Sequence, residues 1–391
     1  MKRNKINSFI PERLTEARGA RGFTKTEIAK TTGVSHQMIS KYEKGQSEPS
    51  AITLNAISDT LNLPLAFFIK DHEMMNPVVF FRSQAAARIK TKKISSTRIL
   101  WLQRVQEYFE KILDFPDVNL PMAKDNTSFS ETSLSEIEDI ALYLRRHWGV
   151  GLEPISNLTH LLEKNGIIIS RSTFFDLKID ACSTWQALKR PYVLLSYDKG
   201  SSVRSRFDLA HELGHLLLHS RLDHVEFNNK TNYKKIEKEA NHFASAFLLP
   251  EEPFSEELKV NSLGHYITLK EKWRVSIAAM LYRAEALGIL SDYQVLHMRK
   301  TLAKNKMRTK EPLDDKITFE KPQALKQAIE LILHHDVKSK GQIVNELGLS
   351  REDIEVFCNL GQGALKEENK YNDNIIQFNF KKSQNEYPLS K

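Results

Sequence analysis

The stretch Asp208-Leu209-Ala210-His211-Glu212-Leu213-Gly214-His215-Leu216-Leu217-Leu218-His219 decides the fold around it. Its leucines recur at helical spacing, which predicts a helix with one buried side. Side chains four residues apart on a helix lie on one face, roughly 5–6 Å apart at Cβ, so His211 and His215 can hold one metal ion. Burying two histidines and a glutamate is costly unless they are paired or bind a metal. The His-Glu-x-x-His pattern therefore predicts a metal site on a core helix.

Zinc suits this pattern because it binds imidazole nitrogen, and catalytic zinc sites keep one position open for water. Glu212 is then the predicted general base, acting on the water that zinc activates. The alternative is a chance match on a structural helix. His219 lies about 12 Å along the helix axis from His211, too far to share the ion, and is expected to pack or to form a hydrogen bond.

A second helix is expected to supply the third ligand. In the run from Tyr233 to Pro250, an apolar stripe recurs at helical spacing. Glu237 and Glu239 flank this stripe on opposite sides, so periodicity leaves both open. Glu237 shares its face with Asn241, which could orient it as a partner outside the ligand set.

The two helices together resemble a known family. HELGHLLLH followed by E-x-x-A-N-x-F-A-x-x-x-L-x-P is similar to the ImmA/IrrE metallopeptidases, which are gluzincin-like, and Arg204-Ser205-Arg206-Phe207 matches the approach to the first helix. The resemblance covers about residues 130–300. It implies that Glu237 is the third ligand, and that the enzyme cleaves a repressor-type protein in a stress-response, phage or mobile-element circuit.

Residues 8–70 predict a five-helix domain, with helices over residues 10–20, 25–31, 36–44 and 50–61 and a fifth from Pro64. Thr24 and Ser35 are predicted helix caps and Gly33 a turn, which is the plan of a helix-turn-helix. The expected buried positions are Leu14, Ile28, Ala29, Val34, Ile39, Leu54, Ile57 and Leu61.

The third of these helices carries the candidate DNA-binding residues. His36, Gln37, Ser40 and Lys41 could reach base edges, and Lys25 and Lys44 could hold phosphates. The run TKTEIAKTTGVSHQMISKYEKGQSEPSAITLNAISDTLNLP resembles the XRE, lambda-repressor-like, family, in which the positions of Gln37 and Ser40 read bases. The alternative is a helical interaction module without DNA binding.

The rest of the chain completes an α+β, mostly helical fold. Residues 71–132 are interpreted as a connector, with a strand at 78–81, a helix at 99–113 and a basic run that is either a solvated charge run or a nucleic-acid surface. The basic residues are Arg88, Lys90, Lys92 and Lys93. Residues 133–300 are the predicted peptidase domain, with helices at 133–147 and 155–164 and strands at 167–169, 181–185 and 192–197. A helical pair at 269–287 is either its scaffold or a second DNA reader. Residues 317–364 form a C-terminal helical unit, and 366–391 a disordered tail.

Three further hypotheses concern the site. The strand at 192–197 is a candidate sheet edge for binding substrate backbone. Cys182 is a candidate inhibitory zinc ligand, since thiolate binds zinc well; a small buried hydrophobe is the alternative. The donor that stabilises the oxyanion is sought among Tyr233, His242, Tyr282 and Arg283, without a choice between them.

Composition agrees with a nucleic-acid or acidic partner. The chain has 391 residues, 41% of them hydrophobic, and a net charge of +8. Two cysteines make no disulfide framework, and the sequence contains neither a signal peptide nor a membrane span, so we expect a cytoplasmic protein. Two functions compete: a zinc endopeptidase acting on a protein substrate, with DNA bound through its N-terminal domain, and a DNA-binding regulator whose peptidase-like domain is a sensor or inactive. Self-association is left open.

Overall fold

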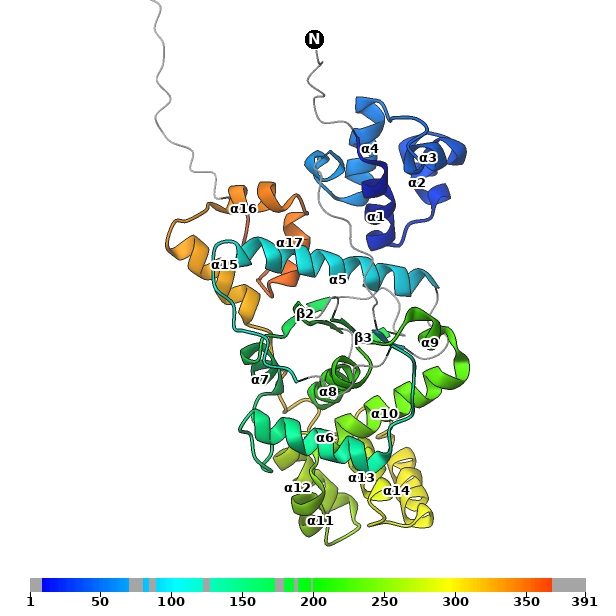
Figure 1. Ribbon diagram of the computed structural model, residues 1–391, viewed down its shortest axis with the longest axis vertical. Helices are drawn as coiled ribbons and strands as arrows, with labels where there is room; N and C mark the ends of the chain where they lie inside the picture. The colour runs from blue at the N-terminus through cyan, green and yellow to red at the C-terminus, as the bar shows by residue number, and fades with distance from the viewer. Residues whose placement is uncertain are drawn as a thin grey trace, which may run out of the picture.

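The computed structural model of the chain describes residues 9–69, 80–83, 89–121, 127–172, 179–185, 189–197 and 200–367. Helical layers lie on both faces of a four-stranded sheet whose order is β1-β3-β4-β2 (Figure 1). The strands are β1 (Phe80–Ser83), β2 (Ile168–Ser172), β3 (Ile179–Thr184) and β4 (Tyr192–Ser196). β3 pairs antiparallel with β1 and β4, and β2 pairs parallel with β4.

The predicted helix-turn-helix is present, and each of its helices has an identifiable local cause. Thr24 and Glu27 form a capping box, Ser35 caps the third helix, and Gly33 takes a φ of 71° in the turn. Val34 and Leu54 are half-buried, whereas the other expected core positions are buried. The fifth expected helix is a 3-10 turn. The elements are α1 (Pro11–Arg21), α2 (Lys25–Thr32), α3 (His36–Glu43), α4 (Ala51–Leu61) and η1 (Leu65–Phe68).

Helix α5 (Ile89–Glu110) lies between the helix-turn-helix and the sheet (Figure 1). Trp101 is fully buried, donates to Glu16 Oε1 at 2.7 Å, and packs edge-on against Phe67 of η1. On its other side, α5 shares one apolar core with Cys182 and Leu194 of the sheet. The region predicted as a connector therefore contains a core helix. Arg88, Val78 and Val79 lie outside the described residues.

The C-terminal helical unit packs on the same side of the sheet. Its helices are α15 (Ala324–His334), α16 (Lys340–Leu347) and α17 (Arg351–Phe357). They join α5 and the helix-turn-helix in one core. Asp353 of α17 accepts from Arg21 of α1 at 2.9 and 2.5 Å, so the first and last helical units are directly bonded. The predicted tail lies outside the described residues from 368 onward.

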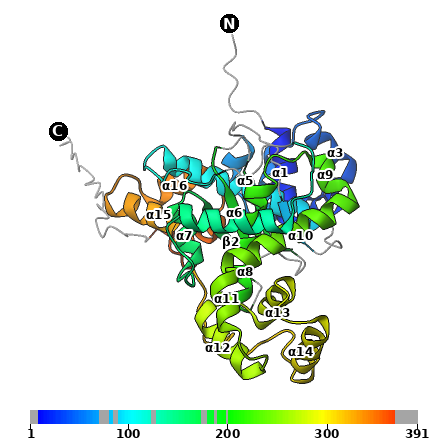
Figure 2. The ribbon, with the colours of Figure 1, turned by 60° about the horizontal axis from the view of Figure 1, so that its bottom comes forward.

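The opposite face carries the other helices. They are α6 (Leu134–His147), α7 (Leu158–Lys164), α8 (Ser202–Leu218), α9 (His224–Asn228), α10 (Lys230–Leu248), α11 (Glu251–Glu257), α12 (Leu263–Trp273), α13 (Ile277–Ala286) and α14 (Asp292–Lys304). α8 lies on the sheet, and α10 packs across α8. Helices α11 to α14 extend to the end of the molecule away from the helix-turn-helix (Figures 1 and 2). The helical pair predicted at 269–287 corresponds to α12 and α13, which pack in the core on the α8 side of the sheet.

One expectation about the sheet is wrong. The sequence predicts an edge strand at 192–197, but β4 bonds to β3 on one side and to β2 on the other. All five of its residues are buried. A strand covered on both faces has such a nearly continuous apolar run. Among the described strands, the edges are β1 and β2.

Alternation along the strands divides their side chains between two cores. Ala181, Val193 and Leu195 face α8, whereas Cys182 and Leu194 face α5. Successive side chains of a strand point to opposite faces, so this division is fixed by register. No helix among the described residues is long and apolar enough to cross a membrane.

Candidate metal centre

The centre lies where α8 and α10 cross, at Gly214. A Cβ at this position would lie 3.0 Å from Phe243 Cδ1 and 3.3 Å from Ala240 Cα. Glycine in a helix interior costs about 0.5–1 kcal/mol relative to alanine, so its presence here has a packing reason. The close approach places the histidines of α8 opposite the glutamates of α10.

Three side chains converge at the crossing. His211 Nε2 and His215 Nε2 lie 2.9 Å apart, and they lie 3.6 and 3.4 Å from the nearer carboxylate oxygens of Glu237. All three ligand atoms fall within 4.8 Å of one another, and both histidines are buried. Two imidazole nitrogens and one carboxylate oxygen are a donor set that suits zinc.

Each histidine is held through its other ring nitrogen. His211 Nδ1 lies 3.1 Å from Asn241 Oδ1, which accepts from it, and His215 Nδ1 lies 3.0 Å from His219 Nδ1. His219 Nε2 in turn lies 3.1 Å from Glu239 Oε2. Such partners fix the tautomer and orientation of a ligand.

Burial lowers the pKa of His219 to about 4, outweighing the hydrogen bond to Glu239, so the ring is neutral near pH 7. A neutral imidazole has one donor and one acceptor nitrogen. With Nε2–H donating to Glu239, Nδ1 of His219 accepts from Nδ1–H of His215. The lone pair of His215 Nε2 is then directed at Glu237 and His211.

Glu237 and Glu239, which sequence periodicity left open, have different positions. Glu237 joins the two histidines, whereas Glu239 contacts His219 at the end of α8 and also accepts from the backbone N–H of Thr132 at 2.8 Å. Burial raises the pKa of Glu239, but the hydrogen bonds from His219 and Thr132 outweigh it, and the pKa lies below its ordinary value.

Glu212, one residue from His211, is fully buried and held by a strand. Ser183 of β3 donates its Oγ–H to Glu212 Oε2 at 2.5 Å. Ser183 faces α8 because it alternates with Cys182. The bond fixes the carboxylate between the sheet and the histidines. Sequence analysis missed Ser183, Thr132 and the role of Glu239. Ser183 carried a detectable signal, since it alternates with neighbours in a strand that precedes the metal helix.

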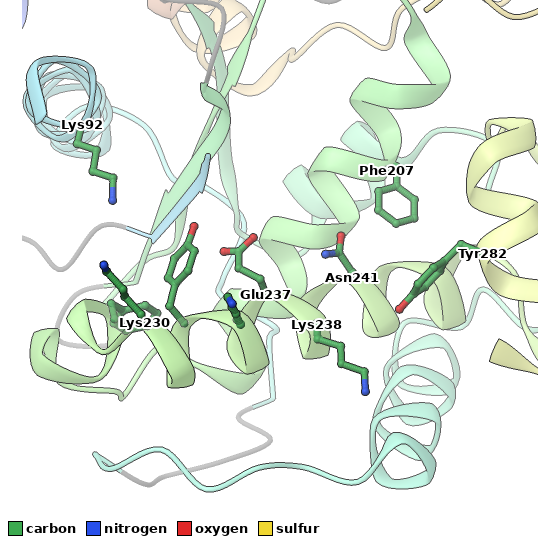
Figure 3. Close-up of a pocket in the computed structure, with 10 residues that line it drawn as sticks. Lys92, Phe207, Lys230, Glu237, Lys238, Asn241 and Tyr282 are labelled. Atoms are coloured by element: carbon green, nitrogen blue, oxygen red, sulfur yellow. The ribbon is translucent and has the colours of Figure 1, made fainter. Parts of the chain in front are cut away.

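A pocket of about 780 Å³ opens beside Glu237. Figure 3 shows Glu237 and Asn241 directed from α10 toward α8, with Lys92 of α5 and Lys230 of α10 on one side and Phe207 and Tyr282 on the other (Figure 3). Of the three converging side chains, Glu237 is the one that lines this pocket, and both histidines are buried behind it.

Other predicted residues lie elsewhere. Cys182 faces the α5 side of the sheet, is fully buried, and does not join the cluster; burial and the nearby charge of Glu212 raise the pKa of its thiol. Of the oxyanion candidates, His242 and Arg283 are buried against Glu138, while Tyr233 and Tyr282 line the pocket.

The predicted DNA-binding residues lie on and beside α3. His36, Gln37, Lys41 and Lys44 are exposed. Ser40 and Lys25 are half-buried and bond to each other at 3.1 Å, and Lys25 also pairs with Glu43 at 3.1 Å. The structure therefore presents four of these side chains to solvent and engages the other two internally.

Comparison with known proteins agrees with both halves of this architecture. Residues 14–68 match the helix-turn-helix family, and residues 163–285 match peptidase family M78, described as the IrrE N-terminal-like domain. The chain combines an XRE-type helix-turn-helix with an IrrE-like peptidase domain. His211, His215, Glu237 and Ser183 all lie within the segment that matches this family.

The helix-turn-helix is also similar to curated proteins. The HTH-type transcriptional regulator SutR of Escherichia coli is 33% identical over 78 residues, which are 20% of this chain and 44% of that protein. An uncharacterized HTH-type transcriptional regulator of Sinorhizobium medicae is 34% identical over 70 residues, 18% of this chain and 50% of the relative. An uncharacterized transcriptional regulator of Rhodospirillum rubrum is 32% identical over 72 residues, 18% of this chain and 67% of the relative. The chain spans about half the length of the first two relatives.

Proposed function

We propose that this protein is a zinc-dependent endopeptidase that binds DNA through its helix-turn-helix and cleaves a regulatory protein, a repressor of the helix-turn-helix class. The observation that carries the proposal is the convergence of His211, His215 and Glu237 beside Glu212, with Glu237 at the wall of an open pocket. The match to peptidase family M78 supports the same chemistry.

His211, His215 and Glu237 would hold the metal, and Asn241 and His219 would orient the two imidazoles. Bound zinc supplies Lewis acidity, which polarises a carbonyl and lowers the pKa of water. Glu212 is positioned to take a proton and to return it to the leaving amine, with Ser183 fixing its carboxylate. Glu212 has no purpose in a purely structural site, so its held position favours an enzyme over a dormant sensor.

Tyr233 is the proposed oxyanion donor. It precedes Glu237 by one helical turn, lines the pocket, and lies on the same face of α10. Tyr282 lines the pocket from α13 and is the competitor. Tyr233→Phe should lower kcat by about 10²-fold or more with zinc content unchanged, the usual cost of losing one such donor; Tyr282→Phe is the matched comparison.

The backbone of the substrate is proposed to pair with β1, and not with β4, which is a central strand. β1 is the edge strand beyond β3, and both strands contact α8. Addition of an extended peptide to a sheet edge gives affinity through main-chain hydrogen bonds with little demand on side chains. A proline at Phe81 tests this geometry: cleavage should fall while zinc content stays constant.

The decisive experiment compares metal content with proteolysis. Wild-type protein loaded with zinc should cleave denatured casein, and a chelator should abolish cleavage that added zinc restores. Glu237→Ala should lose stoichiometric zinc. A protein that binds zinc and operator DNA but cleaves neither casein nor any candidate repressor would instead be a regulator with an inactive peptidase-like domain.

A further inference from the structure

The pocket beside Glu237 has an unusual set of charges for a site that contains a metal-ligating carboxylate. Lys230, Lys234 and Lys238 recur every four residues along α10, next to the Tyr233, Glu237 and Asn241 row. All three lysines are exposed, and none forms an ion pair with a described residue. Residues at this spacing form one stripe on a helix, so the charges add along one wall.

A fourth lysine comes from a different element. Lys92, in the first turns of α5, lines the pocket with its ammonium 6.0 Å from the ring centroid of Tyr233. Figure 3 shows Lys92 and Lys230 directed toward one another across one end of the pocket (Figure 3). Positive charge therefore flanks this end from both α5 and α10.

The opposite end carries aromatic side chains. Phe207 of α8 and Tyr282 of α13 line it beyond Asn241, and Lys238 lies between Glu237 and Tyr282 (Figure 3). Glu237 lies between the basic and the aromatic end, so the metal-binding cluster separates two surfaces of different chemistry. A chain that crosses the cluster meets positive charge before it and aromatic surface after it, or the reverse.

We infer that the pocket selects an acidic peptide segment: Asp or Glu residues on one side of the scissile bond bind the lysines, and an apolar or aromatic side chain on the other side packs on Phe207 and Tyr282. The inference rests on the proposed proteolytic function and adds the class of sequence that is cleaved. A peptide satisfies both ends, because one chain can carry carboxylates in one segment and apolar side chains in the next. A polyphosphate backbone would instead bring its charge past the Glu237 carboxylate.

The first test is a cleavage profile. Zinc-loaded full-length protein is incubated with decapeptides randomised at each position, and the products are identified by mass spectrometry. We expect Asp and Glu to be enriched on one side of the cleaved bond and Phe, Tyr or Leu on the other. In Lys230→Glu/Lys234→Glu, the acidic enrichment should be lost and replaced by Lys or Arg. Both substitutions lie at the start of α10, where acidic residues suit the helix dipole.

The matched control is Lys300→Glu/Lys304→Glu. It makes the same charge change at two exposed lysines of α14 that do not line the pocket. Its profile should equal that of wild type. Acidic enrichment that is absent from wild type, or that survives in Lys230→Glu/Lys234→Glu, overturns the inference while leaving proteolysis intact.

The second test measures binding without turnover. In Glu212→Gln, a labelled decapeptide with Asp and Glu in one half and Phe in the other should bind about tenfold tighter than the same peptide with Asn and Gln in place of Asp and Glu, the scale expected from two or three exposed charge pairs. Salt and the two Lys→Glu changes should remove the difference. If this discrimination holds but no peptide is ever cleaved, the proposed function fails and the acidic-ligand pocket stands. If a ten-nucleotide oligothymidine displaces the acidic peptide and binds tighter through the same lysines, the pocket is a nucleic-acid site and the inference fails.

Discussion

A single hydroxyl positions the predicted general base. Ser183 donates to Glu212 from the sheet, so the carboxylate is not held by its own helix alone. Burial of both groups makes this bond electrostatically strong. The position of Glu212 therefore depends on the register of β3, which a sequence motif on α8 does not contain.

Replacement of Glu212 by Gln should keep the shape of the site and remove its basicity. We expect unchanged zinc content by elemental analysis and a loss of at least about 10³-fold in kcat on a cleavable peptide. Ser183→Ala should lower kcat by a smaller factor with KM nearly unchanged, because it affects only the orientation of the base. Turnover by Glu212→Gln equal to wild type would remove Glu212 from the mechanism.

The pair His219 and Glu239 should act on metal affinity and not directly on chemistry. His219→Ala leaves His215 Nδ1 without its partner, and Glu239→Gln weakens the hold on His219. Loss of such an outer partner typically costs 10–100-fold in metal affinity. Competition with a zinc chelator measures this directly, and affinities equal to wild type would show that the arrangement is only structural.

Two helices make the site, and their separation depends on one glycine. The nearest atoms to a Cβ at Gly214 belong to Phe243 and Ala240 of α10. A larger side chain there must push α10 away from α8, and with it Glu237 from the histidines.

Gly214→Val is therefore expected to lower both the thermal midpoint and the zinc affinity, since overpacking a close helix crossing costs about 1–3 kcal/mol. Gly264→Val in α12 is the matched control, because a Cβ at Gly264 meets nothing within 4 Å. Differential scanning fluorimetry with and without zinc separates the two variants. Equal thermal midpoints of Gly214→Val and Gly264→Val, with and without zinc, would mean that α8 and α10 can move apart without loss of stability or zinc affinity.

Elements with local signals were predictable from sequence, and their arrangement was not. Caps at Thr24 and Ser35 and the leucine pattern around His211 determine helices within a few residues of themselves. The place of β4 between β3 and β2 depends on pairings distant in sequence, so its role as an edge was predicted wrongly. The same non-local pairing assigns Cys182 to the face away from the metal-binding cluster. Resemblance to the family, and not spacing, distinguishes Glu237 from Glu239 as the expected third ligand.

At the scale of the whole molecule, Asp353 joins the C-terminal unit to the helix-turn-helix. Burial raises the pKa of Asp353, but Arg21, Arg98 and Ser350 outweigh it, so the pKa lies below its ordinary value. A carboxyl group with a lowered folded pKa stabilises the fold above its unfolded pKa of about 3.9, and this contribution is lost as pH falls through the folded value.

Asp353→Asn should therefore destabilise the protein by about 3 kcal/mol near pH 7, as expected when one partner of a buried pair is removed. As pH falls below about 4, the difference between wild type and variant should narrow, because Asp353 of the unfolded chain takes up its proton first and the folded protein does so only at its lowered pKa. Denaturant unfolding followed at pH 7 and pH 3 measures both differences. A gap that is constant with pH would mean that Asp353 contributes through packing alone.

Helix α5 contacts the helix-turn-helix, the sheet and the pocket. Trp101 bonds to α1, the apolar side of α5 covers the sheet, and Lys92 lines the pocket. This packing of α5 thus keeps α3 and the cluster of His211, His215 and Glu237 at a constant distance and in a constant orientation relative to one another. For a protein anchored on a promoter, a second DNA-bound molecule is then within reach only when it lies on the correct side of the double helix. We expect its cleavage to rise and fall with inter-site spacing at the roughly 10.5-base-pair period of B-form DNA.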